Sequence, residues 1–125
     1  MAGALALRSV TAATLILATS AVVAQNAPPT FQADPEVYKT IFEDQSLRVI
    51  AATWKKGAHD KFHSHLVPSV VYSLNDCRFL VHTPDGTTRE LLTKAGTAMT
   101  VPITPSHSAE NVGLDDCRAI FVERK

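Results

Sequence analysis

The 125-residue sequence predicts an all-β protein built as a sandwich or barrel. After residue 45 the chain divides into roughly seven short apolar stretches, most of them rich in β-branched residues and spaced at the interval of about 8–12 residues typical of such folds. Sequences rich in Gly, Pro, Asn and Asp separate these stretches, as expected for turns. No stretch has the periodicity of a long helix, so an alternation of strands and helices is not expected.

The predicted strands follow one another in chain order, and each ends at a turn sequence. Pro84-Asp85-Gly86 is a hairpin signal between two of them, and Lys94-Ala95-Gly96 is a second turn. The segment 35–44 (PEVYKTIFED) is the only one with a short helical or irregular character. The strands are expected at 46–54, 68–74, 77–83, 87–93, 97–103, 107–112 and 117–124.

The first 24 residues differ in kind from the rest. Arg8 supplies one positive charge, and residues 10–24 form an apolar run that ends in small side chains. This pattern is typical of a secretory signal peptide, here cleaved before Gln25. An uncleaved anchor or a packed helix is the alternative, but the run is short and interrupted by Thr and Ser for a membrane span.

This interpretation divides the chain into a signal peptide (1–24), an extended or irregular N-terminal segment (25–45) and one β domain (46–125). The mature protein would be periplasmic or secreted, with no stable membrane anchor after cleavage. The formal net charge is zero, so no basic surface indicates a nucleic-acid partner.

The segment 57–65 (GAHDKFHSH) contains three of the five histidines. Residues two apart on a strand point to the same face, so His63 and His65 would project together. Two such imidazoles can hold a first-row transition metal, although an exposed His-x-His sequence also occurs on ordinary surfaces. The pair alone does not decide between these alternatives.

A second stretch, 96–111 (GTAMTVPITPSHSAEN), favours the metal site. The two stretches together resemble the paired motifs of the cupin family, whose first motif has Gly, five residues and His-x-His. Its second motif has Gly, five residues, Pro-x-Gly, two residues, His, three residues and Asn. The matching positions are Gly57, His63, His65, Gly96, Pro102, His107 and Asn111.

The resemblance implies a cupin-type jelly-roll barrel of two antiparallel sheets, with His63, His65 and His107 facing one divalent transition metal inside it. A set of three imidazole ligands does not identify the metal, which could be Fe, Mn, Ni, Cu or Zn. The family's metal-binding Glu is replaced by Ser69, which leaves the ion its full positive charge. Asp76 and Thr104 replace motif glycines, with an expected effect on turn geometry alone.

Three functions are compatible with this site. The first is a metal-dependent enzyme, such as a dioxygenase acting on a small organic substrate, with Ser69 orienting water or substrate. The second is a non-catalytic module that binds a small ligand or a metal, and the third is a structural cupin. Some cupins associate through an outer sheet face, so a homodimer is a further expectation.

The other candidate residues have structural interpretations. His59 is expected to be exposed and His82 to lie on the surface or rim, while Asn111 would form hydrogen bonds near a strand end. Cys77 and Cys117 both begin strands that would be antiparallel neighbours. That arrangement places them at opposite ends of a shared ladder and argues against a disulfide, although exported cysteines commonly pair. The expected core or pocket residues are Trp54, Phe62, Phe79, Met99 and Phe121.

Overall fold

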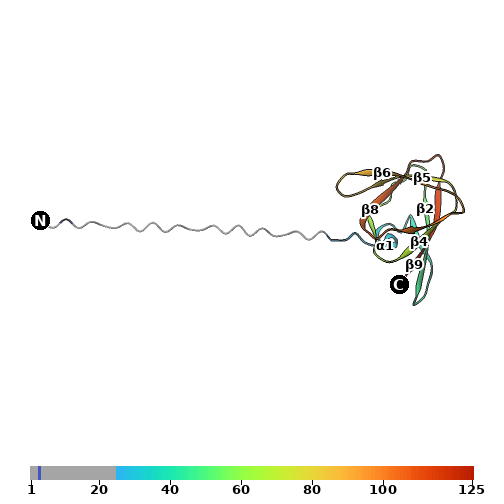
Figure 1. Ribbon diagram of the computed structural model, residues 1–125, viewed down its shortest axis with the longest axis horizontal. Helices are drawn as coiled ribbons and strands as arrows, with labels where there is room; N and C mark the ends of the chain where they lie inside the picture. Colours follow the sequence, from blue (N-terminus) through green and yellow to red (C-terminus); the bar gives the residue numbers. More distant parts are fainter. Residues whose placement is uncertain (1–2, 4–24) are drawn as a thin grey trace.

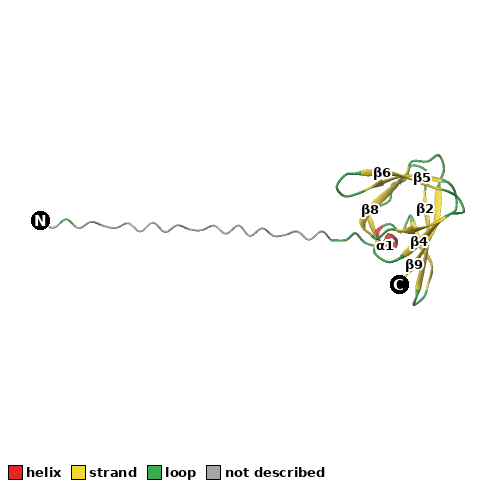
Figure 2. Cartoon of the chain, in the orientation of Figure 1, coloured by secondary structure: helices red, strands yellow, loops and turns green. Residues whose placement is uncertain are grey.

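The computed structural model describes residues 3 and 25–125. The predicted signal peptide therefore lies outside the described residues, apart from Gly3. From residue 25 on, nearly all regular structure is β, arranged as two antiparallel sheets that face each other around a core (Figure 1). No helix of this described part is long and apolar enough to span a membrane. Figure 2 shows that the short helix α1 (Thr30–Ala33) lies at the margin of the strands.

One sheet has five strands in the order β1-β2-β9-β4-β7, and the other has four in the order β3-β8-β5-β6. The first sheet contains β1 (Tyr38–Glu43), β2 (Leu47–Trp54), β9 (Cys117–Arg124), β4 (Ser69–Ser73) and β7 (Ala98–Val101). The second contains β3 (His63–His65), β8 (Thr104–Asn111), β5 (Cys77–His82) and β6 (Thr88–Thr93). This architecture confirms the all-β jelly-roll prediction.

Strand β9 is the centre of the five-stranded sheet, because it pairs with β2 along its whole length and with β4 on its other side. Its residues alternate between the inside and the outside of the barrel. Phe121 and Ala119 point into the core with Cys117, while Arg118 and Val122 point outward. The sequence indicated this strand by its apolar stretch, and the structure shows that alternate residues of that stretch build one face of the core.

The N-terminal segment 25–45 is more regular than expected. It contains the short helix α1 (Thr30–Ala33) and the strand β1, which pairs with β2. A register shift between Thr40 and Phe42 interrupts the ladder, and only Tyr38 of this strand is buried. An edge strand with one buried residue and an irregular register has no apolar alternation in its sequence, which explains why the pattern did not predict it.

Cys77 and Cys117 form a disulfide, with their Cα atoms 5.7 Å apart. The expectation that they lie at opposite ends of one ladder is wrong. It assumed that β5 and β9 are neighbours in one sheet, whereas β5 belongs to the four-stranded sheet and β9 to the five-stranded sheet. Both strands begin at the same end of the barrel, so the bond ties the two sheets together.

The histidine-bearing strand β3 is an edge strand of only three residues. Its outer edge is covered by the chain that precedes α1, since Ser64 N donates to Pro28 O at 2.8 Å and Pro29 forms a bridge with Ser64. On the neighbouring strand, Ala27 N donates to Pro105 O at 3.0 Å. The segment 27–29 therefore seals the edge of the sheet next to the histidines.

Candidate metal centre

Three histidines from two adjacent strands meet inside the barrel. His63 and His65 come from β3 and His107 from β8, with His63 and His107 directly paired in register. The ring centroids are 4.6–5.0 Å apart. One ligand nitrogen from each ring lies within 4.8 Å of the others, so the group could hold a metal ion. This grouping matches the three positions expected from the sequence.

The hydrogen bonds of His63 leave one of its nitrogens free for a metal. Nδ1 lies 2.9 Å from Lys61 O, which can only accept, so Nδ1 donates the proton. In the neutral ring Nε2 then has an exposed lone pair. The Tyr38 hydroxyl is 3.4 Å from Nε2 but gives its proton to Asp60 Oδ2 at 2.7 Å, so it does not occupy that lone pair. A backbone carbonyl on Nδ1 is the usual partner of a metal-binding imidazole.

The other two rings also fit a metal. Burial lowers the pKa of His65 to about 3, with further contributions from His63 and His107. Burial likewise lowers the pKa of His107 to about 4, helped by His63 and Arg89. Both imidazoles are therefore neutral at ordinary pH, as metal ligands must be. His65 Nδ1 is buried and has no hydrogen-bond partner among the described residues, a costly arrangement unless another group satisfies the ring.

A buried carboxylate supports the segment that leads into β3. Asp60 accepts hydrogen bonds from Tyr38 Oη at 2.7 Å, Trp54 Nε1 at 2.8 Å and the backbone N of Ala109 at 2.7 Å. These donors come from β1, β2 and β8, so Asp60 joins both sheets. Its carboxylate lies 3.7 Å from His63 Nδ1. Asp60 could not be predicted from the sequence, because a single Asp in a hydrophilic segment has no pattern that predicts burial.

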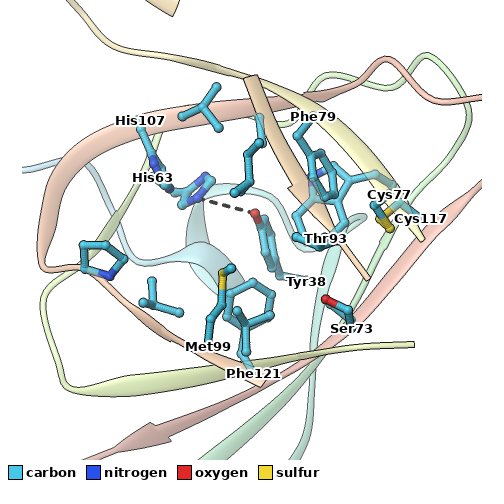
Figure 3. Close-up of a pocket in the computed structure, with 18 of the residues that line it drawn as sticks. Tyr38, His63, Ser73, Cys77, Phe79, Thr93, Met99, His107, Cys117 and Phe121 are labelled. Atoms are coloured by element: carbon cyan, nitrogen blue, oxygen red, sulfur yellow. Dashed lines mark hydrogen bonds between the residues drawn. A yellow bond between two sulfur atoms is a disulfide. The ribbon is translucent and has the colours of Figure 1, made fainter. Parts of the chain in front are cut away.

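His63 and His107 line a cavity of about 310 Å³ between the sheets, whereas His65 does not belong to its lining. Figure 3 shows His63 and His107 on one side of it and the Cys77–Cys117 disulfide on the opposite side. Most of the remaining lining is apolar and includes Trp54, Phe79, Val81, Leu91, Met99, Val101 and Phe121. Arg89 of β6 is the one lysine or arginine among the lining residues. A small, largely apolar molecule would fit this space.

Ser69 lies on the inward face of β4, as expected, and is buried. Val71 and Ser73 of the same face line the cavity, whereas Ser69 does not belong to its lining. Its hydroxyl has no hydrogen-bond partner among the described residues, and its neighbour across the sheet is Glu123. The role of Ser69 in orienting water or substrate stays a prediction.

The structure confirms burial for most, but not all, of the aromatic residues predicted to lie in the core or pocket. Trp54, Phe79 and Phe121 are buried as expected, but Phe62 is 43% exposed, because it lies in the irregular segment before β3 and points to solvent. Met99 is 42% exposed and contributes to the cavity wall.

The structural role predicted for Asn111 is confirmed. Its amide donates to three backbone carbonyls and its Oδ1 accepts from Gly113 N.

Comparisons with known proteins bear on the fold. No protein-family model matches the sequence, and no curated protein matches it. Among solved structures, a cupin domain from Bordetella pertussis aligns with a TM-score of 0.65 and 18% identity, covering 82% of this chain and 99% of that one. The chain has the cupin fold. An RmlC-like cupin with a double-stranded β-helix fold from Methanocaldococcus jannaschii aligns at 0.56 and 12% identity, covering 70% and 78% of the two chains.

The motif positions of the cupin fold now have structural explanations. Gly57 and Gly96, which begin the two motifs, have φ angles of +76° and +75°, a region that glycine adopts without strain. Gly57 lies in the turn that precedes the histidine-bearing segment 59–65, and Gly96 lies in the turn before β7, the strand that precedes β8 and His107. Thr104, at a motif glycine position, pairs with His65 inside the β3–β8 ladder, so a side chain is accommodated there. These departures leave the three-histidine group intact.

Proposed function

We propose that this protein binds one divalent transition metal through His63, His65 and His107 and acts on a small, largely apolar molecule held in the adjoining cavity. The convergence of three imidazoles inside the barrel, two of which (His63 and His107) line that cavity, supports the proposal. Three imidazole ligands leave coordination positions open for water or for an oxygen atom of the ligand. The ion is Fe, Mn, Ni, Cu or Zn, all of which accept imidazole nitrogen.

The cavity selects the ligand by size and by charge. A volume of about 310 Å³ is at the lower end of the range for small-molecule sites, and most of the wall is apolar. Arg89 is exposed at the surface yet lines the cavity, and its charge contributes to the lowered pKa of His107. A compact apolar ligand with a carboxylate or another anionic oxygen group therefore matches the wall and Arg89 together.

The chain's own ionisable groups are poor acid–base catalysts here. None of the described lining residues is a carboxylate, and Tyr38 has its pKa raised well above the ordinary value, first by burial and then by the nearby Asp60 charge. Tyr38 thus remains protonated and serves as a hydrogen-bond donor. The metal would supply Lewis acidity or, if redox-active, electron transfer with dioxygen. Oxidoreductase activity of the dioxygenase type is the reaction class that best fits this set of residues.

Elemental analysis of the full chain, purified without chelators or a histidine tag, tests metal binding. We expect about one equivalent of metal in this site, lost in His107→Ala, because two remaining imidazoles bind weakly. The matched control is Ser106→Ala, one residue earlier on β8 and on the opposite face, which should keep the metal. Equal metal content in His107→Ala and Ser106→Ala would overturn the assignment.

A non-catalytic binding module is the second candidate, favoured by the enclosed apolar cavity itself. Oxygen consumption separates the two. A metal-loaded protein that binds small carboxylates but consumes no oxygen with any of them would be a binding module.

We also propose that the protein is exported, since the disulfide joining Cys77 and Cys117 is of the kind that persists in oxidising compartments.

A further inference from the structure

A second group of potential metal ligands lies on the outer face of the four-stranded sheet. It consists of His59, His82 and Glu110, with one ligand atom of each within 4.8 Å of the others. His82 belongs to β5 and Glu110 to β8, and His59 lies in the segment before β3. These residues are distinct from the histidines of the inner site, which approach from the opposite side of β8.

The sheet register explains how these three residues meet. The segment 57–60 runs along β8, where Gly57 N donates to Asn111 O and Asp60 N to Ala109 O, and His59 forms a bridge with Glu110. On the other side of β8, His82 is paired with Ser108. Three adjacent chain segments therefore place His59, Glu110 and His82 side by side on one face. Figure 1 shows β5 next to β8 in this sheet.

The side chains are already in contact with one another. His82 Nε2 lies 3.2 Å from Glu110 Oε2, and the His59 and His82 rings are stacked with their centroids 4.6 Å apart. The fully buried Ser108 hydroxyl is hydrogen-bonded to His59 Nε2 at 2.8 Å and fixes the orientation of that ring. His59 is exposed and the other two are half-buried, so a metal ion has access from solvent.

We propose that His59, His82 and Glu110 form a second metal site, selective for ions that prefer mixed nitrogen and oxygen ligands, such as Cu²⁺, Ni²⁺ or Zn²⁺. Two imidazoles and a carboxylate neutralise one of the two charges of such an ion. Solvent-facing positions remain for water. The stacking of His59 on His82 brings a third potential ligand beside the His82–Glu110 pair, which the hydrogen bond of that pair does not by itself require.

An ion in this site would bind the segment 57–60 to the sheet. Asp60 and His63 follow His59 within four residues, so the outer site holds the chain that positions part of the inner site. The proposal does not depend on the inner site being occupied. The two can therefore be tested separately, because His107→Ala removes an inner ligand and leaves the outer three residues unchanged.

Copper binding by the full chain with the His107→Ala substitution tests the outer site. Equilibrium dialysis with Cu²⁺ should give one equivalent, and the electron paramagnetic resonance spectrum should show nitrogen coupling. Adding His82→Ala or His59→Ala should weaken binding at least about tenfold, and Glu110→Gln should also weaken it, because each substitution removes a ligand. His59→Ala also removes the hydrogen bond to the buried Ser108 hydroxyl, so circular dichroism of this variant should first show that the β fold is retained.

Glu90→Gln is the matched control. Glu90 and Glu110 are the two cross-strand neighbours of Leu80, on β6 and β8, and both are carboxylates of the same outer face. Glu90 instead pairs with Arg78, away from the histidines. We expect Glu90→Gln to bind Cu²⁺ as the His107→Ala parent does. Equal affinity in the His59→Ala, His82→Ala and Glu90→Gln variants, or no bound copper in the parent, would overturn the proposal.

Discussion

Tyr38 and Asp60 form a buried hydrogen bond of 2.7 Å that joins the first strand of the five-stranded sheet to the segment leading into β3. The Asp60 side chain is completely inaccessible to solvent and accepts two further hydrogen bonds, from Trp54 and from the backbone of Ala109. This carboxylate therefore holds together the two halves of the barrel directly beside His63.

Asp60→Ala should lower the free energy of unfolding by about 3 kcal/mol or more, because it leaves three buried donors without an acceptor. Tyr38→Phe should cost only about 1.5 kcal/mol, since Asp60 keeps its other two partners. Urea denaturation of both variants measures the difference. If the two substitutions were equally costly, the carboxylate would not be the centre of this network.

Reduction of the disulfide between Cys77 and Cys117 should destabilise the fold. The two cysteines are 40 residues apart, and closing a loop of that size in the unfolded chain contributes roughly 4 kcal/mol. The urea midpoint of the protein should therefore fall on addition of a reductant. The Cys77→Ala/Cys117→Ala variant is the control, and a response of this variant to the reductant would indicate another cause.

Asn111→Ala should destabilise the protein by roughly 2–3 kcal/mol, because the buried amide satisfies backbone groups of two separate segments, at Trp54 and at 113–115. Asn75 provides a matched comparison. It also bridges backbone groups, at Asp116 and Arg118, but it is only partly buried and these hydrogen bonds lie at the surface, so water can replace them. Asn75→Ala should cost about 1 kcal/mol or less. Thermal unfolding of the two variants would contradict this account if Asn75→Ala were the more damaging.

Glu123 should make stability fall as the pH rises. Burial raises its pKa above the ordinary value of 4.5, against the lowering effect of Arg48, while Glu43 adds a small rise. A raised carboxyl pKa means that the folded state favours the protonated form. The associated stability is complete below the ordinary pKa and is lost as the pH passes through the folded-state pKa.

Glu123→Gln removes this titration and retains an oxygen that can accept from Arg48. The unfolding free energy of the variant, relative to the unmodified protein, should therefore increase between about pH 4 and about pH 7. Urea titrations at both pH values measure the trend. A relative stability that stays constant or decreases over this interval would show that Arg48 fully compensates the buried charge.

Arg89→Gln should remove the preference of the cavity for anionic ligands. Benzoate and its neutral analogue benzamide are suitable probes, because they differ in charge but little in shape. We expect binding of benzoate to weaken by about three- to tenfold, with benzamide little affected, since Arg89 is partly screened by solvent. Equal losses for both probes would mean that Arg89 contributes packing rather than charge.

The strands and the inner histidines could be predicted from the sequence for physical reasons. Central strands such as β9 contain a run of apolar residues, here 119–122, and such short runs bounded by turn residues identify strands in the sequence. The spacing of His63, His65 and His107 relative to Gly57 and Gly96 is fixed by turns that need a positive φ. Strands and turns are thus predictable from short stretches of sequence, because the residues that determine their backbone geometry lie next to one another in the chain.

Features that depend on contacts between distant segments could not be predicted in this way. The disulfide partners belong to different sheets, and the outer group of His59, His82 and Glu110 is created by the register of three segments. Asp60 is one residue from His59 and looks equally hydrophilic, yet it is buried while His59 is exposed. An irregular segment lacks the alternation that would have separated their environments.

The hydrogen bonds of Ala27 and Pro28 to the strands beside the histidines have a consequence for expression and engineering. These residues emerge from the ribosome before any of their partners, so the sheet edge at β3 can be completed only after Pro105 has been synthesised. A truncation that starts the chain beyond Pro29 would leave that edge uncovered and prone to pair with another molecule. Affinity tags for purification are therefore better placed after Lys125 than directly before Ala27.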